Sequence, residues 1–302
     1  MSADTATDPQ SRTDVAVSRL ARRDARPGAT SAWSLVRSSI EEVSARFAAL
    51  LRSISDGSAR AVGRWSIAET AAHTLIACEF DGFAAGGRAP LVEFLDLADA
   101  ILSAGVADVA SLNEQALARE TERELGVLAD RIESEVAALL AATADLDGEE
   151  RVAWLGGAPV SRTGVLAHLL FELHIHGRDI ARSRRRPWPV PVPQAAAIYD
   201  RFFKEYGVER FVVPSATPVD VSLELRVEGS EPVRLAFIAG RLRPDVPGSG
   251  RIDVRVTADP ATLLLVTFRR MQPLAAVLRG RLRISGRRPW RARHLTQVVR
   301  MP

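Results

Sequence analysis

Three of the five histidines in this 302-residue sequence lie close together around a glutamate, Glu172. On a helix, Glu172 and His176 project from one face about 40° apart, because they are four residues apart. His168 lies one turn earlier on the same stripe, next to the apolar Leu169, so we expect the polar atoms to face a helical interior. A buried stripe of this composition is costly unless every polar group has a partner.

A divalent metal ion would satisfy this stripe, since neutral imidazole and carboxylate are standard ligands for such ions. Asp179 lies one turn beyond His176 on the stripe, whereas His174 is two residues off it and points elsewhere. Two other interpretations stay open at this point: a hydrogen-bonded core cluster without metal, and a partly exposed helix edge. The spacing alone does not separate the three.

A fourth histidine, His73, occurs mid-way along a different helical segment, on a stripe with the apolar Ile76 and Phe80. A lone histidine in such a place is commonly a hydrogen-bonded core residue. Two inward-facing polar positions on separate long helices nevertheless favour a shared site, made of His73, Glu172 and His176. Three protein ligands leave open positions for water or a thiol, which is the catalytic type of metal site.

The single cysteine, Cys78, is five residues after His73 and therefore about 140° around the helix from it. We expect a small core residue there and not a nucleophile. One cysteine excludes an intramolecular disulfide framework and any metal site built from several cysteines.

No apolar run reaches the roughly eighteen residues of a membrane helix, and the N-terminus is polar, so we expect a cytoplasmic protein without a membrane partner.

The charge is nearly balanced, with 40 basic and 37 acidic residues, but it is unevenly distributed. No acidic residue follows Asp259, whereas ten arginines do. The preferred interpretation is a solvated arginine-rich surface. Nucleic acid is not the expected partner, because the segment 269–293 has only Trp290 as an aromatic residue and carries no motif that reads DNA.

Helical spacing of apolar residues identifies the elements that must position these groups. Four long stretches show it: 33–54, 66 to about 86, 121 to about 139, and 161–184. Capping boxes predict two of the starts, Ser66 with Glu69 and Thr121 with Glu124. Four long helices predict a four-helix bundle, with one or two short helices in 90–119 and an extended piece near 152–159.

Four prolines between Pro187 and Pro193 end this pattern and predict a stiff linker. A helix follows near 194–206, then a helix opened by Asp259-Pro260, and alternating segments that predict strands at 219–227, 233–239, 252–257 and 282–285. The expected fold class is α + (α+β), in which a helical bundle precedes a small α+β domain. The expected division is a disordered extension at 1–30, a bundle at 31–186, a linker at 187–193 and the α+β domain at 194–302.

The segment 172–182, ELHIHGRDIAR, together with Trp65-Ser66 and His73 upstream, resembles the mycothiol-dependent maleylpyruvate isomerase family. The segment 278–286, LRGRLRISG, resembles the C-terminal domain of that family, which is related to sterol carrier proteins. The resemblance implies a DinB-like metal-binding four-helix bundle followed by a sterol-carrier-like α+β domain. It also implies metal ligands at His73, Glu172 and His176. It assigns no role to His168, for which a place behind a ligand is the natural expectation.

The resemblance further implies a cytoplasmic enzyme that uses a divalent ion, with zinc as the expected metal, to activate a small thiol such as mycothiol. The thiolate would add to an electrophilic small-molecule substrate, either for cis–trans isomerisation as with maleylpyruvate or for S-transfer. Arginines of the C-terminal domain would then hold substrate carboxylates by bidentate bonds. The alternative is a non-enzymatic carrier that binds an apolar molecule in the C-terminal domain.

Overall fold

The structure, a computed structural model, describes residues 31–86, 95–211, 220–239, 241–244 and 252–294. The predicted disordered extension at 1–30 lies outside the described residues.

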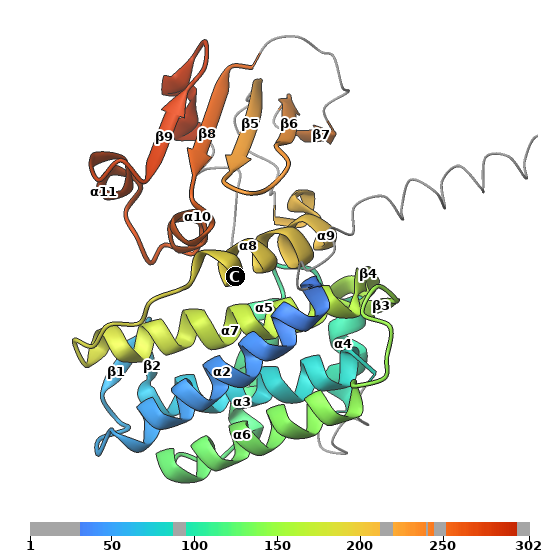
Figure 1. Ribbon diagram of the computed structural model, residues 1–302, viewed down its shortest axis with the longest axis vertical. Coiled ribbons are helices and arrows are strands. Elements are labelled where there is room, and N and C mark those ends of the chain that lie inside the picture. Colours follow the sequence, from blue (N-terminus) through green and yellow to red (C-terminus); the bar gives the residue numbers. More distant parts are fainter. Residues whose placement is uncertain (1–30, 87–94, 212–219, 240, 245–251, 295–302) are drawn as a thin grey trace, which may run out of the picture. The chain divides into compact units, whose positions relative to one another are not determined.

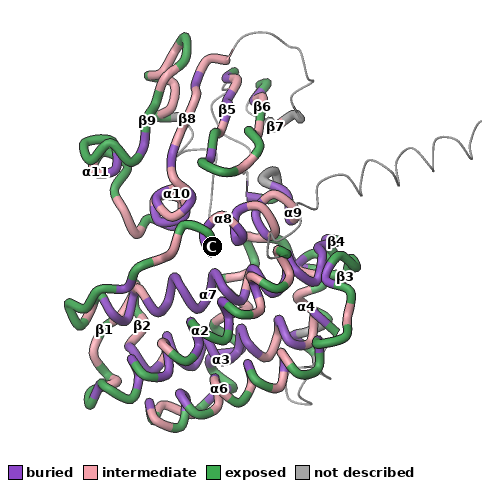
Figure 2. The backbone as a smooth tube through the Cα atoms, viewed as in Figure 1, coloured by how far each residue is buried: buried purple, intermediate pink, exposed green. Residues whose placement is uncertain are grey.

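Four long helices form the first part of the chain, as predicted: α2 (Ala32–Arg52), α3 (Ile67–Ala84), α6 (Leu125–Ala142) and α7 (Arg162–Ser183) (Figure 1). Helices α2 and α3 each pack against both α6 and α7, which is the arrangement of a four-helix bundle. Figure 2 shows that α7 is buried along most of its length, whereas α2 and α6 each present an exposed side. The helix that carries Glu172 and His176 is therefore surrounded by protein.

The start of α3 follows the predicted capping box. The Ser66 hydroxyl accepts a hydrogen bond from the Glu69 N–H at 3.1 Å, and the Glu69 carboxylate accepts one from the Ser66 N–H at 2.8 Å. This cap lies at the end of a small hairpin, β1 (Arg60–Val62) and β2 (Trp65–Ser66), which fixes where α3 enters the bundle.

The capping box predicted at Thr121 is wrong, because α6 begins only after Glu124. Glu124 has the extended backbone of an N-cap, and its carboxylate accepts the Val127 N–H at 2.8 Å. Upstream, the Glu122 carboxylate accepts the N–H groups of Arg123 and Glu124. These local bonds compete with the helix for the same donors and delay its start.

The connections between the long helices also agree with the expected pattern. In the described part of the chain between α3 and α6 there are two short helices, α4 (Leu95–Ser103) and α5 (Val109–Arg119). The extended piece before α7 is a hairpin of β3 (Arg151–Trp154) and β4 (Ala158–Ser161), joined by the turn η2 (Leu155–Gly157).

The proline-rich segment is held against the bundle through the buried Trp188. A Cβ atom on Gly177 of α7 would lie 2.3 Å from the Trp188 ring, so only glycine allows this approach. The guanidinium of Arg46 stacks 4.0 Å from the same ring. The next helical run packs on α7 and consists of α8 (Val192–Ala197), the π-helical η3 (Ile198–Phe203), α9 (Lys204–Tyr206) and η4 (Val208–Phe211).

A five-stranded sheet follows, in the order β7-β6-β5-β8-β9. Its strands are β5 (Val221–Val227), β6 (Val233–Ile238), β7 (Arg241–Pro244), β8 (Val254–Ala258) and β9 (Leu282–Ser285), all antiparallel except the β5–β8 pair. The last helices are α10 (Pro260–Thr267), α11 (Pro273–Leu278) and η5 (Pro289–His294). Strand β7 was not predicted, because a short edge strand with a single leucine among its four residues shows no alternation.

Glu224, in the central strand β5, is fully buried and accepts hydrogen bonds from three arginines of the sheet. Arg226, Arg234 and Arg255 donate to it at 2.6, 3.0 and 2.5 Å. Burial raises the pKa of this carboxyl, but the three guanidiniums outweigh it and bring the pKa down to about 2. Glu224 therefore stays ionised inside the sheet.

We expect Glu224→Gln to lower the free energy of unfolding by about 2 kcal/mol at pH 7, since it removes charge-assisted bonds whose arginine ends are partly screened. A depressed carboxyl pKa stabilises the fold above the unfolded value near 4.5 and loses that contribution as pH falls toward 2. The gap between parent and variant should therefore narrow from pH 5 to pH 2 in urea unfolding curves. Glu228→Gln, at an exposed site, is the matched control, and equal curves for both variants would contradict this account.

Candidate metal centre

The bundle brings the three predicted ligand residues together, His73 from α3 and Glu172 with His176 from α7. The Nε2 atoms of His73 and His176 lie 3.4 and 3.0 Å from Oε2 of Glu172. One ligand atom from each of the three residues lies within 4.8 Å of the others, and all three residues are buried. The two imidazole rings meet edge to face with centroids 4.9 Å apart.

This donor set fits a divalent metal ion. Two ligands about 2.0–2.1 Å from a tetrahedral zinc ion lie roughly 3.3 Å apart, which is close to both nitrogen–oxygen separations seen here. Oε2 of Glu172, to which both imidazoles point, is buried and has no partner that meets hydrogen-bond geometry. A buried carboxylate oxygen in that state calls for a cation.

His168 lies behind Glu172, as expected for a residue that orients a ligand. Its Nε2 is 3.2 Å from Oε1 of Glu172, the oxygen that faces away from the other two histidines, and its Nδ1 is 2.8 Å from Asp81. The indole N–H of Trp154 donates to the other Asp81 oxygen at 3.2 Å. The sequence analysis missed Asp81 and Trp154; the available signal was an acidic residue eight positions after His73 on the same helix.

Asp179 lies behind His176 in a similar way, with Oδ2 3.6 Å from Nδ1 of that histidine. Arg270, in the turn after α10, donates two hydrogen bonds of 3.1 and 2.6 Å to the Asp179 carboxylate. This contact ties the C-terminal segment to the bundle next to the candidate centre. Nothing in the sequence singles out Arg270 from the other arginines near it.

Burial and the paired carboxylates set the charge states of the cluster. Burial raises the pKa of Glu172, but the three neighbouring histidines hold it well below its usual range. Burial lowers the pKa of His73. The same burial acts on His168 and His176, yet their neighbouring carboxylates raise those pKa values to about 10 and about 9. In the metal-free cluster, protonated His168 and His176 therefore balance the negative charge of the carboxylates.

His174 is kept apart from the centre, as predicted. Its Nε2 lies 2.8 Å from Oε1 of Gln194, whose amide in turn donates to Glu42 at 3.1 Å. Burial lowers the pKa of His174 to about 4, so the ring is neutral. It is a core histidine with a hydrogen-bond partner.

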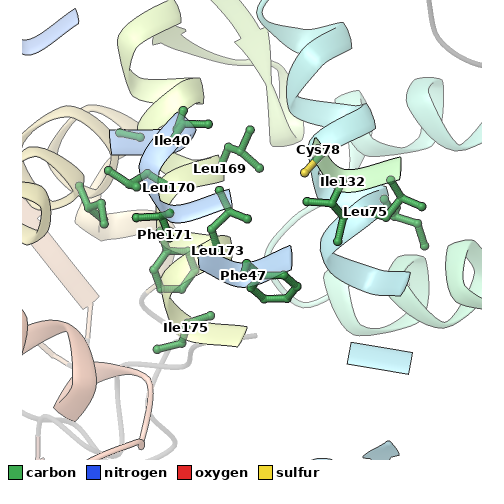
Figure 3. Close-up of a cluster of buried hydrophobic side chains, with 14 of the residues drawn as sticks. Ile40, Phe47, Leu75, Cys78, Ile132, Leu169, Leu170, Phe171, Leu173 and Ile175 are labelled. Atoms are coloured by element: carbon green, nitrogen blue, oxygen red, sulfur yellow. The ribbon is translucent and has the colours of Figure 1, made fainter. Parts of the chain in front are cut away.

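Cys78 is a core residue, as predicted, and only 1% of it is exposed. Figure 3 shows it near Ile132 and Leu75, and burial raises its thiol pKa well above the ordinary value. We expect Cys78→Ala to keep metal content and turnover while lowering the free energy of unfolding by about 1 kcal/mol, from the lost packing. Parallel metal analysis, activity assay and urea unfolding check this. Lost turnover in a folded, metal-loaded variant would make the thiol of Cys78 part of the chemistry.

A cavity of about 480 Å³ opens onto the centre and is lined by His73, His168, Glu172 and His176. Its other lining residues come from the β1–β2 hairpin, from α3, α4, α5 and α7, from the end of β3, and from residues that follow the proline-rich segment. The cavity is large enough for a small organic molecule next to the three candidate ligands.

Comparison with known proteins divides the chain in the same order. Residues 39–180 match the DinB superfamily, and residues 216–288 match the SCP-2 sterol transfer family. The sequence has no match among curated proteins. Two solved structures of mycothiol-dependent maleylpyruvate isomerase, one of them a mutant, are similar over 77% of this chain and 87% of theirs, with 16% and 15% identity and a TM-score of 0.45 in each case. None of the helices in the described residues is both long and apolar enough to cross a membrane.

Proposed function

For a chain that carries a DinB-like domain followed by an SCP2-like domain, we propose the function of a metal-dependent enzyme that activates a low-molecular-weight thiol. The observation that carries the proposal is the convergence of His73, Glu172 and His176 on one point at the wall of a cavity. Mycothiol is the proposed thiol because segment 172–182 resembles the mycothiol-dependent isomerase family.

His73, Glu172 and His176 would hold the ion, with zinc as the proposed metal. When bound, such an ion converts a coordinated thiol, whose free pKa is about 8.5, into a thiolate at neutral pH. Three protein ligands leave room for that thiol in the open position.

The surrounding residues orient the ligands. His168, held by Asp81, fixes one oxygen of Glu172 and leaves the other free for the ion. Asp179, held by Arg270, lies beside the ring nitrogen of His176 that faces away from the centre. Such contacts fix the orientation of the side chains that hold the ion and raise the affinity of the site for the metal.

The proposed reaction is addition of the thiolate to an electrophilic carbon of a small molecule. In a transferase reaction a carbon–sulfur bond forms, a proton is delivered to the neighbouring carbon, and the adduct leaves. In an isomerase reaction the adduct rotates about the former double bond and expels the thiolate, which gives the trans isomer. The chain is proposed to act in the cytoplasm on small molecules, and the isomerase and transferase reactions are separated by the product formed.

We also propose the domain division predicted from the sequence, with the bundle at 31–186, the linker at 187–193 and the sterol-carrier-like domain at 194–302. The bundle supplies all three proposed metal ligands. The later segment contributes Arg270 and part of the cavity wall.

A second candidate, a non-enzymatic carrier of an apolar molecule, is favoured by the many apolar side chains around the cavity. Turnover separates the two. The full chain, purified with its metal, should show about one ion per chain by elemental analysis. It should also be stabilised in thermal melts by mycothiol more than by glutathione or cysteine, and should consume mycothiol with an electrophile. A chain that holds no metal and responds to no thiol would leave only the carrier.

A further inference from the structure

We infer that the substrate cavity is built for an uncharged, largely apolar molecule, aromatic or long-chain, and not for a dicarboxylate. The assignment of this molecule as the electrophile rests on the proposed function, whereas the selectivity of the cavity rests on its walls alone.

One wall of the cavity is aromatic. Phe202 and Phe203, which are consecutive residues of the π-helical η3, both line it, and their rings lie 4.9 Å apart. Trp154 contacts Phe202 at 5.0 Å, and Phe171 contacts Phe268 at 4.4 Å between ring centroids. Aromatic rings at these distances form a continuous apolar surface that favours stacking and edge contacts with a ligand ring.

A second part of the cavity lining is aliphatic. It is made of side chains from α3, α4 and α5: Ile76, Ala77, Leu97, Ile101 and Val109. An apolar ligand that fills the cavity would remove both walls from water, which stabilises binding in proportion to the area covered. A volume of about 480 Å³ lies in the range of pockets that bury small organic ligands.

The guanidiniums of the described cavity lining already have carboxylate partners, which disfavours a dianion. Among the described residues, the guanidiniums that line the cavity are Arg64 and Arg270. Arg270 is engaged by both oxygens of Asp179, and Arg64, at an exposed position, is hydrogen-bonded to Glu114. The predicted use of a C-terminal arginine to clamp a substrate carboxylate is therefore not met by Arg270. Its Nε–Nη2 edge is taken by Asp179, and its Nη1 donates to the Phe268 carbonyl.

Carboxylates also line the cavity, namely Asp81, Glu114 and Glu172. Each of these carboxylates already has a cationic neighbour, namely His168, Arg64 or His176. A dicarboxylate would therefore lose its hydration without gaining an unpaired guanidinium in return. Other arginines, Arg60, Arg182 and Arg269, line a separate depression that borders the cavity, and all three are exposed. These arginines can contact a polar molecule in solvent, but they do not line the interior of the cavity.

The test is direct binding, without thiol, to the full chain before and after chelator treatment. N-phenyl-1-naphthylamine is an uncharged probe whose fluorescence rises in apolar surroundings. Competitors are benzylideneacetone, an uncharged aromatic enone, and maleate. We expect saturable probe binding at one site and displacement by benzylideneacetone at a concentration at least 100-fold below that required of maleate.

Val109→Trp fills the cavity from α5 and should weaken probe binding at least tenfold, whereas Val127→Trp, at an exposed site on α6, should not. Ala110→Arg adds a cation at an exposed position of the cavity wall and should improve competition by maleate, with the exposed Ala118→Arg on the same helix as control. Maleate competing as well as the enone would overturn the inference. So would undiminished probe binding in Val109→Trp, since the probe would then sit elsewhere.

The probe-binding and competition experiments do not depend on the proposed thiol chemistry. If the probe results hold but no thiol adduct of benzylideneacetone forms with metal and mycothiol present, the enzyme function fails and the cavity assignment stands. If adducts form only with dicarboxylate electrophiles, the function stands and the assignment of the apolar substrate fails.

Discussion

Alanine in place of His73, Glu172 or His176 is expected to lower the affinity for the metal by more than about 100-fold, because three protein ligands leave no redundancy. All three donors converge on the same buried point, so each loss removes a ligand and leaves two. Activity with mycothiol should fall in step with metal content. Elemental analysis of the purified variants, with competition against a chelator of known affinity, measures the effect.

Two further histidine variants give the series its controls. His168→Ala keeps the three ligands but frees Glu172 to move, and a loss of about 10–100-fold in metal affinity is expected. His174→Ala should keep the metal and lose stability, since it leaves a cavity and an unpaired Gln194 oxygen in the core. Full metal in Glu172→Ala and His176→Ala, or a dependence on His174, would refute the proposed centre.

The half of the centre that lies on one helix could be predicted from the sequence. Glu172 and His176 are four residues apart on a helix whose length and apolar stripe are unambiguous, so their shared direction follows from helix geometry. His73 could be proposed but not placed, because its distance from Glu172 depends on how α3 packs on α7. The way two helices pack together cannot be predicted from the spacing of residues within either helix.

The supporting contacts could not be predicted for the same reason. Asp81 meets His168 across two helices, and Arg270 reaches Asp179 from a turn 91 residues later. The aromatic wall likewise depends on the π-helical η3, which presents Phe202 and Phe203 to one cavity although they are consecutive. The wrongly predicted start of α6 shows that even local patterns can mislead. Thr121 and Glu124 have the spacing of a capping box, but the Glu122 carboxylate accepts the nearby N–H groups instead.

Among single substitutions of residues that surround the candidate ligands, loss of Arg270 is expected to lower the free energy of unfolding most. Asp179 is only 5% exposed, and both of its oxygens are bonded to Arg270. Arg270→Met would leave that carboxylate buried without its guanidinium, which typically costs about 3–5 kcal/mol. The pKa of Asp179, which the neighbouring His176 and Arg270 now hold low against the effect of burial, would rise as a result.

A double-mutant cycle separates this pair from general packing. Asp179→Asn together with Arg270→Met should be less destabilised than the sum of the single variants, because the double variant buries no unpaired charge. Arg269→Met, at the exposed neighbouring position, should stay within about 0.5 kcal/mol of the parent. Urea unfolding gives all four values, and the same variants report metal affinity, which should fall about 10–100-fold when Asp179 no longer supports His176. If Arg270→Met unfolds like Arg269→Met, the contact between Asp179 and Arg270 contributes nothing to the stability of the fold.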